Sequence, residues 1–84
     1  MIKLYTWPDC PNCKRLKAWL VQQNIEFVAQ SFTVVVQTDF IMQDIFGSPP
    51  ILQVSSGILV GEDMFEGHDL QEQPIRRLIS DNTR

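Results

Sequence analysis

Residues 2–13 decide the fold, and they read Ile-Lys-Leu-Tyr-Thr-Trp-Pro-Asp-Cys-Pro-Asn-Cys. Residues 2–6 alternate in polarity and are rich in β-forming side chains, which predicts a first strand. Trp7, Pro8 and Asp9 end that strand, and Pro11 suits the first turn of a helix, where a missing N–H costs no hydrogen bond. Two cysteines separated by two residues are therefore expected where a strand passes into a helix.

The expected place of Cys10 at the start of a helix favours thiol chemistry. The free N–H groups and the positive end of a helix dipole stabilise a thiolate, which is the nucleophilic form of cysteine. Cys13 follows one turn later, within reach of a disulfide with Cys10. We therefore expect Cys10 to attack a substrate disulfide and Cys13 to resolve the mixed disulfide, which makes both of them catalytic residues.

Composition narrows the classes of function further. The 84 residues fit a single domain, 1–84, and 44% hydrophobic with 20% charged residues is typical of a globular protein. A net charge of −3 disfavours a nucleic-acid-binding surface. Only two cysteines and no apparent secretion signal or membrane span predict a cytoplasmic monomer with no nucleic-acid or membrane partner.

The rest of the chain predicts a small α/β domain with the element order βαβαββα. After the first strand, the expected elements are a helix from Pro11 to about residue 23, a strand over 25–29, a helix over 37–46, strands over 51–54 and 58–60, and a last helix. Asn24 is expected to be left-handed after the first helix, and Gly47 to stop the second. This order predicts one mixed sheet with helices on its faces.

Two segments stay open. The β-branched run over 33–36 would also suit a strand, so residues 31–36 are left unassigned. Asp69 and Glu72 have the spacing of a capping box at the start of the last helix. Pro74 then either kinks that helix or begins a second one, because a proline in a helix interior removes a hydrogen bond.

The chain resembles the glutaredoxin family of the thioredoxin fold over about residues 2–79. The resemblance is carried by Leu4-Tyr5-Thr6, the Cys-Pro-Asn-Cys motif at 10–13 with Lys14-Arg15-Leu16-Lys17, Pro49-Pro50-Ile51-Leu52, and Glu66-Gly67-His68-Asp69-Leu70. It implies a thioredoxin fold, with a small four-stranded mixed sheet flanked by three helices. It also implies a dithiol thiol–disulfide oxidoreductase that acts on protein disulfides.

The resemblance further implies a substrate site around the cysteines. In this family a cis proline opens the third strand beside the cysteine pair, and Pro50 is similar to that residue, because Leu52 and Val54 then alternate inward. Without the resemblance, His68 would be expected to be an ordinary surface residue, as a single histidine usually is. The implied substrate-binding residues are Trp7, Pro11, Asn12, Pro49, Pro50, Gly67, His68 and Asp69.

Three positions differ from the family pattern for glutathione. Trp7 stands where the family has a lysine, and Pro49 stands where a valine backbone bonds the bound peptide. Residues 65–67, Phe-Glu-Gly, replace a double glycine and place Glu66 near the expected glutathione carboxylate. The implied cofactor set is thus the redox-active disulfide alone, with glutathione a possible but weak ligand.

The electron donor has two candidates. Tyr5, Thr6 and Asp9, with residues 65–67, are similar to the hydrogen-donor redoxins of ribonucleotide reductase, which thioredoxin reductase reduces. The resemblance therefore implies either a thioredoxin reductase-like dithiol or glutathione as the thiol donor.

Metal binding is the competing class of function. A Cys-X-X-Cys pair can supply half of a zinc site, which needs four ligands. One chain offers only two cysteines and His68, so the alternative is a metal or iron–sulfur cluster held across a dimer, and no metal site is expected within a single chain.

Overall fold

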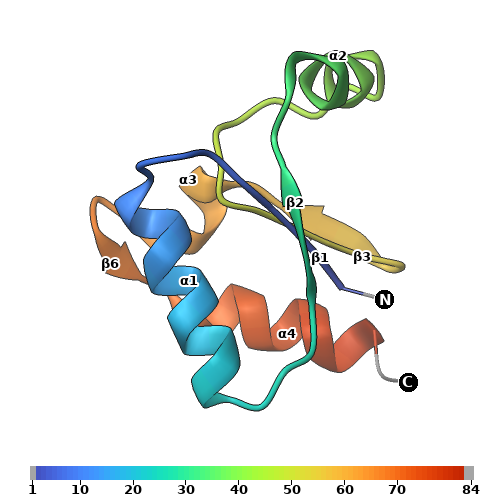
Figure 1. The fold of residues 1–84 in the computed structure, drawn as a ribbon. Helices are drawn as coiled ribbons and strands as arrows, with labels where there is room; N and C mark the ends of the chain where they lie inside the picture. Colours follow the sequence, from blue (N-terminus) through green and yellow to red (C-terminus); the bar gives the residue numbers. More distant parts are fainter. Residues whose placement is uncertain (1, 83–84) are drawn as a thin grey trace.

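Four short strands form a mixed sheet at the centre of the computed structural model, which describes residues 2–82 (Figure 1). The strands are β1 (Lys3–Thr6), β2 (Val28–Ser31), β3 (Ile51–Val54) and β4 (Gly57–Leu59), in the order β2-β1-β3-β4. β1 pairs in parallel with β2 and antiparallel with β3, and β3 pairs antiparallel with β4. The predicted mixed sheet is confirmed.

The first helix, α1 (Pro11–Gln22), carries the cysteine motif and packs by its apolar side on one face of the sheet. Its buried side chains Leu16, Trp19 and Leu20 share a core with Leu4 of β1 and Leu52 of β3. Asn24 follows the helix with a φ of 56°, which confirms the predicted left-handed residue. The N–H of Asn24 donates to Val21 and that of Ile25 to Leu20, which together form a Schellman motif.

The second strand begins three residues later than the predicted range, 25–29. Ile25 is still engaged in the turn that closes α1, and both Ile25 and Phe27 pack against the first core instead of pairing in the sheet. The apolar character of this segment therefore reflects core packing. β2 itself is an edge strand, and all four of its residues are exposed.

The second helix, α2 (Val34–Met42), resolves the open segment 31–36. Its N-cap is Thr33, whose hydroxyl accepts a hydrogen bond from the Val36 N–H at 3.3 Å. This cap and the contacts of Val36 and Phe40 with the core prevail over the β-preference of the valine run.

α2 also ends earlier than the predicted 37–46. Asp44 takes the left-handed conformation, with a φ of 59°. The Asp44 N–H donates to Ile41 and the Ile45 N–H to Phe40, at 3.0 and 2.8 Å, so a second Schellman motif ends the helix before Gly47 is reached.

A second core lies on the other face of the sheet. It is built from Tyr5, Phe32, Phe40, Ile51 and Val60. Figure 1 shows α2 (green) at the top, beyond the ends of the strands and away from α1 and α4. β3 is thus buried on both faces, since Leu52 faces the first core and Ile51 the second.

The last third of the chain holds more elements than the predicted βαβαββα order. A short helix, α3 (Gly61–Met64), follows β4, and after it comes a two-stranded ribbon of β5 (Phe65–Glu66) and β6 (Asp69–Leu70). The last helix is α4 (Glu72–Asn82). The described chain therefore adds a fourth, short helix to the three that the sequence predicts.

The start of α4 corrects two expectations. Asp69 pairs with Glu66 in the ribbon, so it does not cap the helix that begins at Glu72. Pro74 is the third residue of α4, where a backbone N–H has no partner within the helix, so the helix is neither kinked nor split there. In the part of the chain that the structure describes, no helix has the length and apolar character needed to cross a lipid bilayer.

Candidate redox site

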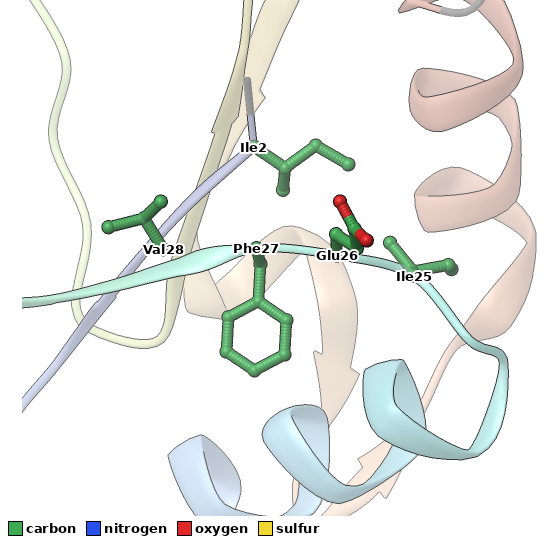
Figure 2. A pocket seen from close by; sticks show the side chains of 5 residues that line it. All are labelled: Ile2, Ile25, Glu26, Phe27 and Val28. Carbon is green, nitrogen blue, oxygen red and sulfur yellow. The ribbon is translucent and has the colours of Figure 1, made fainter.

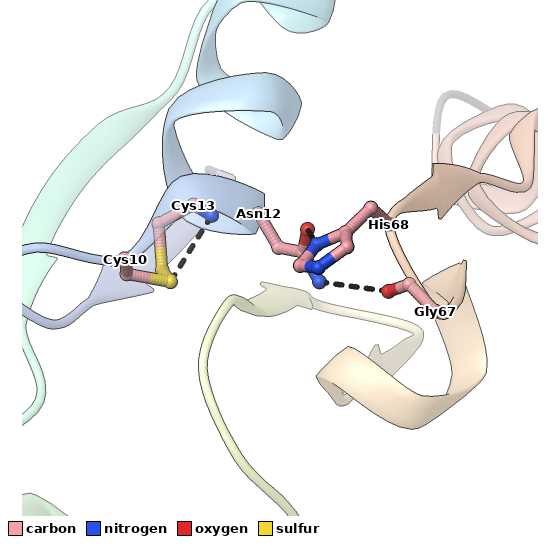
Figure 3. Close-up of a disulfide and its surroundings, with 5 residues drawn as sticks. All are labelled: Cys10, Asn12, Cys13, Gly67 and His68. Carbon is pink, nitrogen blue, oxygen red and sulfur yellow. Dashed lines mark hydrogen bonds between the residues drawn. A yellow bond between two sulfur atoms is a disulfide. The ribbon is translucent and has the colours of Figure 1, made fainter.

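Cys10 is the N-cap of α1 and forms a disulfide with Cys13 (Figure 3). Its backbone is extended, and its sulfur accepts a hydrogen bond from the Cys13 N–H at 3.1 Å. The Cys10 carbonyl accepts the first helical hydrogen bond from Lys14 at 3.2 Å. One side chain thus satisfies a free N–H of the first turn and places its sulfur at the positive end of the helix dipole.

The two sulfurs differ in access to solvent. Cys13 is only 3% exposed and lies within the body of the protein, whereas Cys10 is half-buried. Asp9, directly before Cys10, is exposed and left-handed with a φ of 56°, so the chain reverses there and brings Cys10 to the surface. An incoming group can therefore reach Cys10 before it can reach Cys13.

The Pro49–Pro50 peptide bond is cis, as predicted, and both prolines are buried. After them, Leu52 and Val54 are buried and Gln53 is half-buried, where its Oε1 accepts from the Tyr5 hydroxyl at 3.3 Å. The inward alternation of Leu52 and Val54, on which the choice of Pro50 as the cis proline depends, is therefore present.

The segment before these prolines is held by the start of α3. The Gly61 N–H donates to the Ser48 carbonyl at 2.9 Å, and a Cβ on Gly61 would lie 2.7 Å from that same oxygen. The Ser48 N–H donates to Glu62 Oε1 at 3.2 Å. The close approach requires glycine at 61, and it fixes the edge of the segment that leads to Pro49.

Asn12 joins the cysteine motif to the turn between β5 and β6. Its Nδ2 donates to the Gly67 carbonyl at 3.1 Å, and its Oδ1 lies 3.2 Å from Nδ1 of His68. Figure 3 shows the Asn12 side chain reaching from α1 toward both residues. Gly67 is left-handed, with a φ of 66°, as a tight turn between two strands requires. No local pattern foretells this contact, because the partners are 55 and 56 residues apart.

A shallow pocket of about 270 Å³ lies among these segments. It brings together three of the predicted substrate-binding residues, Asn12, Pro49 and Gly67, with Ser48, Gly61, Glu62 and Phe65. The one charged residue that lines it is Glu62. The sequence instead predicts Glu66 as the acidic residue near a bound glutathione, but Glu66 lies in β5 and does not line this pocket.

The other predicted substrate-binding residues do not line this pocket. Trp7 is 44% exposed and contacts the Phe32 ring edge-on, with the ring centroids 5.7 Å apart. Pro11 is exposed at the first position of α1, and Pro50 is fully buried. His68 and Asp69 are both exposed.

A larger, open hollow of about 660 Å³ lies at the opposite end of the strands (Figure 2). It is lined by Ile2, Ile25, Glu26, Phe27 and Val28, at the starts of β1 and β2. Figure 2 shows Phe27 and Val28 leaving the chain in opposite directions. Glu26 is its only ionisable side chain, so this hollow has no pair of groups able to act as nucleophile and base.

Metal ligands do not gather at the site. Within residues 2–82, no group of three or more His, Cys, Asp or Glu side chains lies close enough to hold a metal ion.

Similarity to known proteins agrees with this geometry. The family model described as Glutaredoxin matches residues 2–35, which include both cysteines. A curated relative from Clostridium pasteurianum is described as an uncharacterized glutaredoxin-like 8.6 kDa protein in rubredoxin operon. It is 31% identical over 75 residues, which cover 87% of this chain and 100% of the relative.

Two crystal structures of the thioredoxin-like protein BC3987 share the fold. A single-residue mutant matches with a TM-score of 0.71 and 18% identity, over 94% of this chain and 99% of the other. The second structure matches with a TM-score of 0.70 and 20% identity, over 93% and 99%. At such identities the likeness shows the fold alone, which is thioredoxin-like. With the relative above and the Cys10–Cys13 pair, the chain belongs to the glutaredoxin family as a glutaredoxin-like protein with a thiol redox function.

Proposed function

We propose that this protein is a dithiol thiol–disulfide oxidoreductase, with Cys10 as the nucleophile and Cys13 as the resolving thiol. The observation that carries the proposal is the asymmetry of the pair. Cys10 is accessible and caps α1, whereas Cys13 is 3% exposed one turn further in. The helix N-terminus and the Cys13 N–H would stabilise a Cys10 thiolate once the disulfide is reduced.

The reaction conserves electrons through two exchanges. The Cys10 thiolate attacks one sulfur of a protein disulfide, the substrate S–S bond breaks, and the leaving thiolate takes up a proton. Cys13 then loses its proton and attacks the Cys10 sulfur of the mixed disulfide, which releases the second substrate thiol. Two electrons pass from the dithiol to the substrate, and a thiol or dithiol donor restores the reduced pair.

Substitution of each cysteine tests the assignment. Cys13→Ser should accumulate a mixed disulfide between Cys10 and insulin, visible by non-reducing electrophoresis, because the resolving thiol is missing. Cys10→Ser should abolish insulin reduction with dithiothreitol as the donor and trap nothing. Equal, partial losses in the two variants would contradict the division of roles.

The pocket beside the disulfide supports a peptide segment as the substrate group. Asn12 stands between the two cysteines in the sequence and borders the hollow together with Pro49 and Gly67. We propose that residues flanking a substrate cysteine occupy it. The description of the Clostridium pasteurianum relative, which places that protein in a rubredoxin operon, is consistent with a redox role of this general kind.

A further inference from the structure

α2 carries apolar side chains on two sides. Val36 and Phe40 face the second core. Val34, Val35, Ile41 and Met42 are instead 78%, 71%, 47% and 80% exposed. At about 100° of rotation per residue, these four fall within an arc of roughly 120°, separate from the buried side. Thr38 lies within the same arc, and Gln37 and Asp39 border it on either side. Exposed apolar side chains gathered on one helix face, with polar residues at the edge, mark a site for interaction with a partner.

The exposed face continues past the end of the helix. Phe46 is 67% exposed and, with Ile41, Ile45 and Gln37, lines a narrow crevice of about 70 Å³. We call Val34, Val35, Ile41, Met42 and Phe46 the α2 patch. A crevice within an exposed apolar surface is where an anchoring side chain of a partner protein inserts.

The α2 patch is continuous with the candidate redox site along two routes. Phe46 is followed directly by Gly47, which lines the crevice, and then by Ser48 and Pro49, which line the pocket beside the disulfide. The other route runs beneath the surface, where Trp7 contacts Phe32, and Phe32 stacks on the buried Phe40 of α2 with the centroids 6.1 Å apart. A protein large enough to cover Cys10 would therefore also reach the α2 patch.

Charge decides which occupant fits. Residues 18–75 contain eight acidic side chains and no lysine or arginine. Asp39 and Asp44 are exposed beside the patch, and Glu62 follows toward the pocket. Two copies facing each other through this surface would oppose like charges, and an anionic lipid surface would be repelled in the same way. The matching surface is apolar at its centre and basic at its rim.

We propose that the α2 patch is the docking surface for the disulfide-bearing protein substrate, which binds through an apolar segment flanked by lysine or arginine. The inference rests on the proposed oxidoreductase function and adds the substrate class. Docking places the substrate cysteine against Cys10, while the apolar segment covers α2. The lysine and arginine side chains of α1, at residues 14, 15 and 17, lie on the helix that covers the opposite face of the sheet, so they orient the partner with its basic rim toward α2.

Two matched peptide disulfides test the proposal. Each has a short leucine- and phenylalanine-rich centre and one cysteine in a mixed disulfide with 5-thio-2-nitrobenzoate, and the flanking residues are lysine in one and glutamate in the other. Protein that has been reduced with dithiothreitol and then freed of it should release the coloured thiol from the lysine peptide about tenfold faster at low salt, as the second-order rate constant of a single turnover, which corresponds to kcat/KM. The preference should shrink as salt rises.

Variants separate docking from chemistry. Val35→Gln and Met42→Gln should reduce kcat/KM for the lysine peptide severalfold, whereas Val21→Gln should not, since Val21 is 62% exposed but lies on α1 outside the patch. Turnover of hydroxyethyl disulfide, which is too small to reach α2, should be the same in all three. Circular dichroism of each variant checks that the fold is intact.

Four results would overturn the proposal, and they are distinguishable. Equal rates for both peptides, unchanged in the α2 patch variants, would remove the docking surface while leaving the oxidoreductase function. Absence of wild-type activity toward both hydroxyethyl disulfide and insulin would remove the function itself. A wild-type dimer in sedimentation equilibrium that Met42→Gln dissociates would assign the patch to a second copy. Binding to phosphatidylcholine vesicles that Met42→Gln abolishes would assign it to lipid.

Discussion

Asn12 uses both ends of its side-chain amide within the protein. The amide nitrogen bonds the Gly67 carbonyl, and the amide oxygen lies against the His68 ring. Since that oxygen can only accept, Nδ1 of His68 is the donor, and this holds for both the neutral ring with a proton on Nδ1 and the charged ring. Asn12 thus holds the β5–β6 turn against α1 at the border of the pocket.

We predict that Asn12→Ala weakens protein substrate binding more than it slows chemistry. Without the amide, the turn at Gly67 loses its tie to α1, so the rim of the pocket becomes mobile. KM for insulin should rise severalfold while kcat changes little. The free energy of unfolding should fall by about 1 kcal/mol. His68→Ala is the matched control, because it removes only one of the two contacts and should have the smaller effect. A fall in kcat for hydroxyethyl disulfide as large as that for insulin would indicate a direct catalytic contact.

At this scale, the sequence predicts residues whose roles follow from local spacing. Cys10 and Cys13 follow from their separation and the expected helix start, and the cis bond at Pro50 from strand alternation together with the family resemblance. The contacts of Asn12 and the carboxylate of Glu62 could not be predicted, because their partners are distant in sequence and no periodicity links them.

At the scale of elements, α1 and α2 end in the same way. Each closes with a Schellman motif around a left-handed residue, Asn24 in α1 and Asp44 in α2. Asparagine and aspartate tolerate this conformation better than other residues with a Cβ, and glycine tolerates it best. Asn24 signals the first helix end clearly. Asp44 is easily overlooked, because Gly47 and the apolar Ile45 and Phe46 extend the helical pattern beyond the true end.

We predict that Asn24→Ala and Asn24→Gly have different effects on stability. Alanine should lower the free energy of unfolding by about 1 kcal/mol, since its Cβ meets the backbone in the left-handed region. Glycine should leave the free energy unchanged or slightly higher, because relief of that contact offsets its greater freedom in the unfolded chain. Urea denaturation followed by circular dichroism measures both. Equal destabilisation by the two variants would mean that the asparagine side chain itself stabilises the turn.

The start of α2 shows why a helix arises from a β-branched run. Thr33 satisfies the Val36 N–H, and Val36 and Phe40 then share one side of the helix and enter the second core. Local propensity alone leaves this segment open, because valine favours strands and the deciding contact with the core is made at a distance.

We predict that Thr33→Ala destabilises the protein by about 1 kcal/mol, within the range of roughly 0.5–2 kcal/mol seen for lost N-caps. Thr33→Ser keeps the hydroxyl and is the matched control, with little expected change. Amide exchange at Val36 should increase in the alanine variant alone. Unchanged exchange there would show that packing of Phe40 suffices to hold the first turn.

α4 is joined to α1 through Arg76. Its guanidinium lies over the Trp19 ring at 5.2 Å, bonds Gln23 at 3.2 Å and forms an ion pair with Glu72 at 2.9 Å. Hydrogen bonds from Arg76 and Trp19 lower the pKa of Glu72 below its ordinary value of 4.5. The folded chain therefore binds the Glu72 proton less tightly than the unfolded chain does.

A pH-dependent stability difference follows for Glu72→Gln. The contribution of the Glu72 carboxylate is complete above about pH 4.5, and it is lost as the pH falls through the lower folded-state pKa. The wild type should thus have the higher urea midpoint at pH 7, and the two midpoints should converge in acid. Because Glu72 is exposed, added salt should also reduce the difference. A gap that persists at low pH would point to packing or hydrogen bonding instead of charge.

Across the whole molecule, charge is divided along the chain. All seven lysines and arginines lie within residues 3–17 and 76–84, and eight of the ten acids lie within 26–72. α1 and α4, which carry most of the basic residues, belong to the first core, whereas the acidic segment supplies α2 and the pocket beside the disulfide. This separation of basic from acidic residues can be seen in the sequence. Only the fold shows that Glu62 is the carboxylate that reaches the pocket.

We predict that glutathione is a poor donor for this protein compared with an enzymatic dithiol. Pro49 has no N–H to offer a bound peptide, a loss of about 0.5–1.5 kcal/mol. Glu62 lines the pocket with no lysine or arginine to oppose it, so it repels the carboxylates of glutathione. Charge interactions at an exposed site are worth about 0–1 kcal/mol. The two effects together therefore weaken glutathione binding roughly two- to seventyfold relative to a site with an N–H at 49 and no acid at 62.

Two donor systems test this prediction with hydroxyethyl disulfide as the substrate. Turnover should be faster with thioredoxin reductase and NADPH than with millimolar glutathione, glutathione reductase and NADPH. Glu62→Gln keeps an oxygen for the Ser48 N–H and removes the charge, so it should raise glutathione-dependent turnover, as should Pro49→Val. Glu66→Gln is the matched control, because Glu66 lies outside the pocket lining and its charge should matter less. Efficient wild-type turnover with millimolar glutathione, unaffected by Glu62→Gln, would show that neither Glu62 nor Pro49 governs the choice of donor.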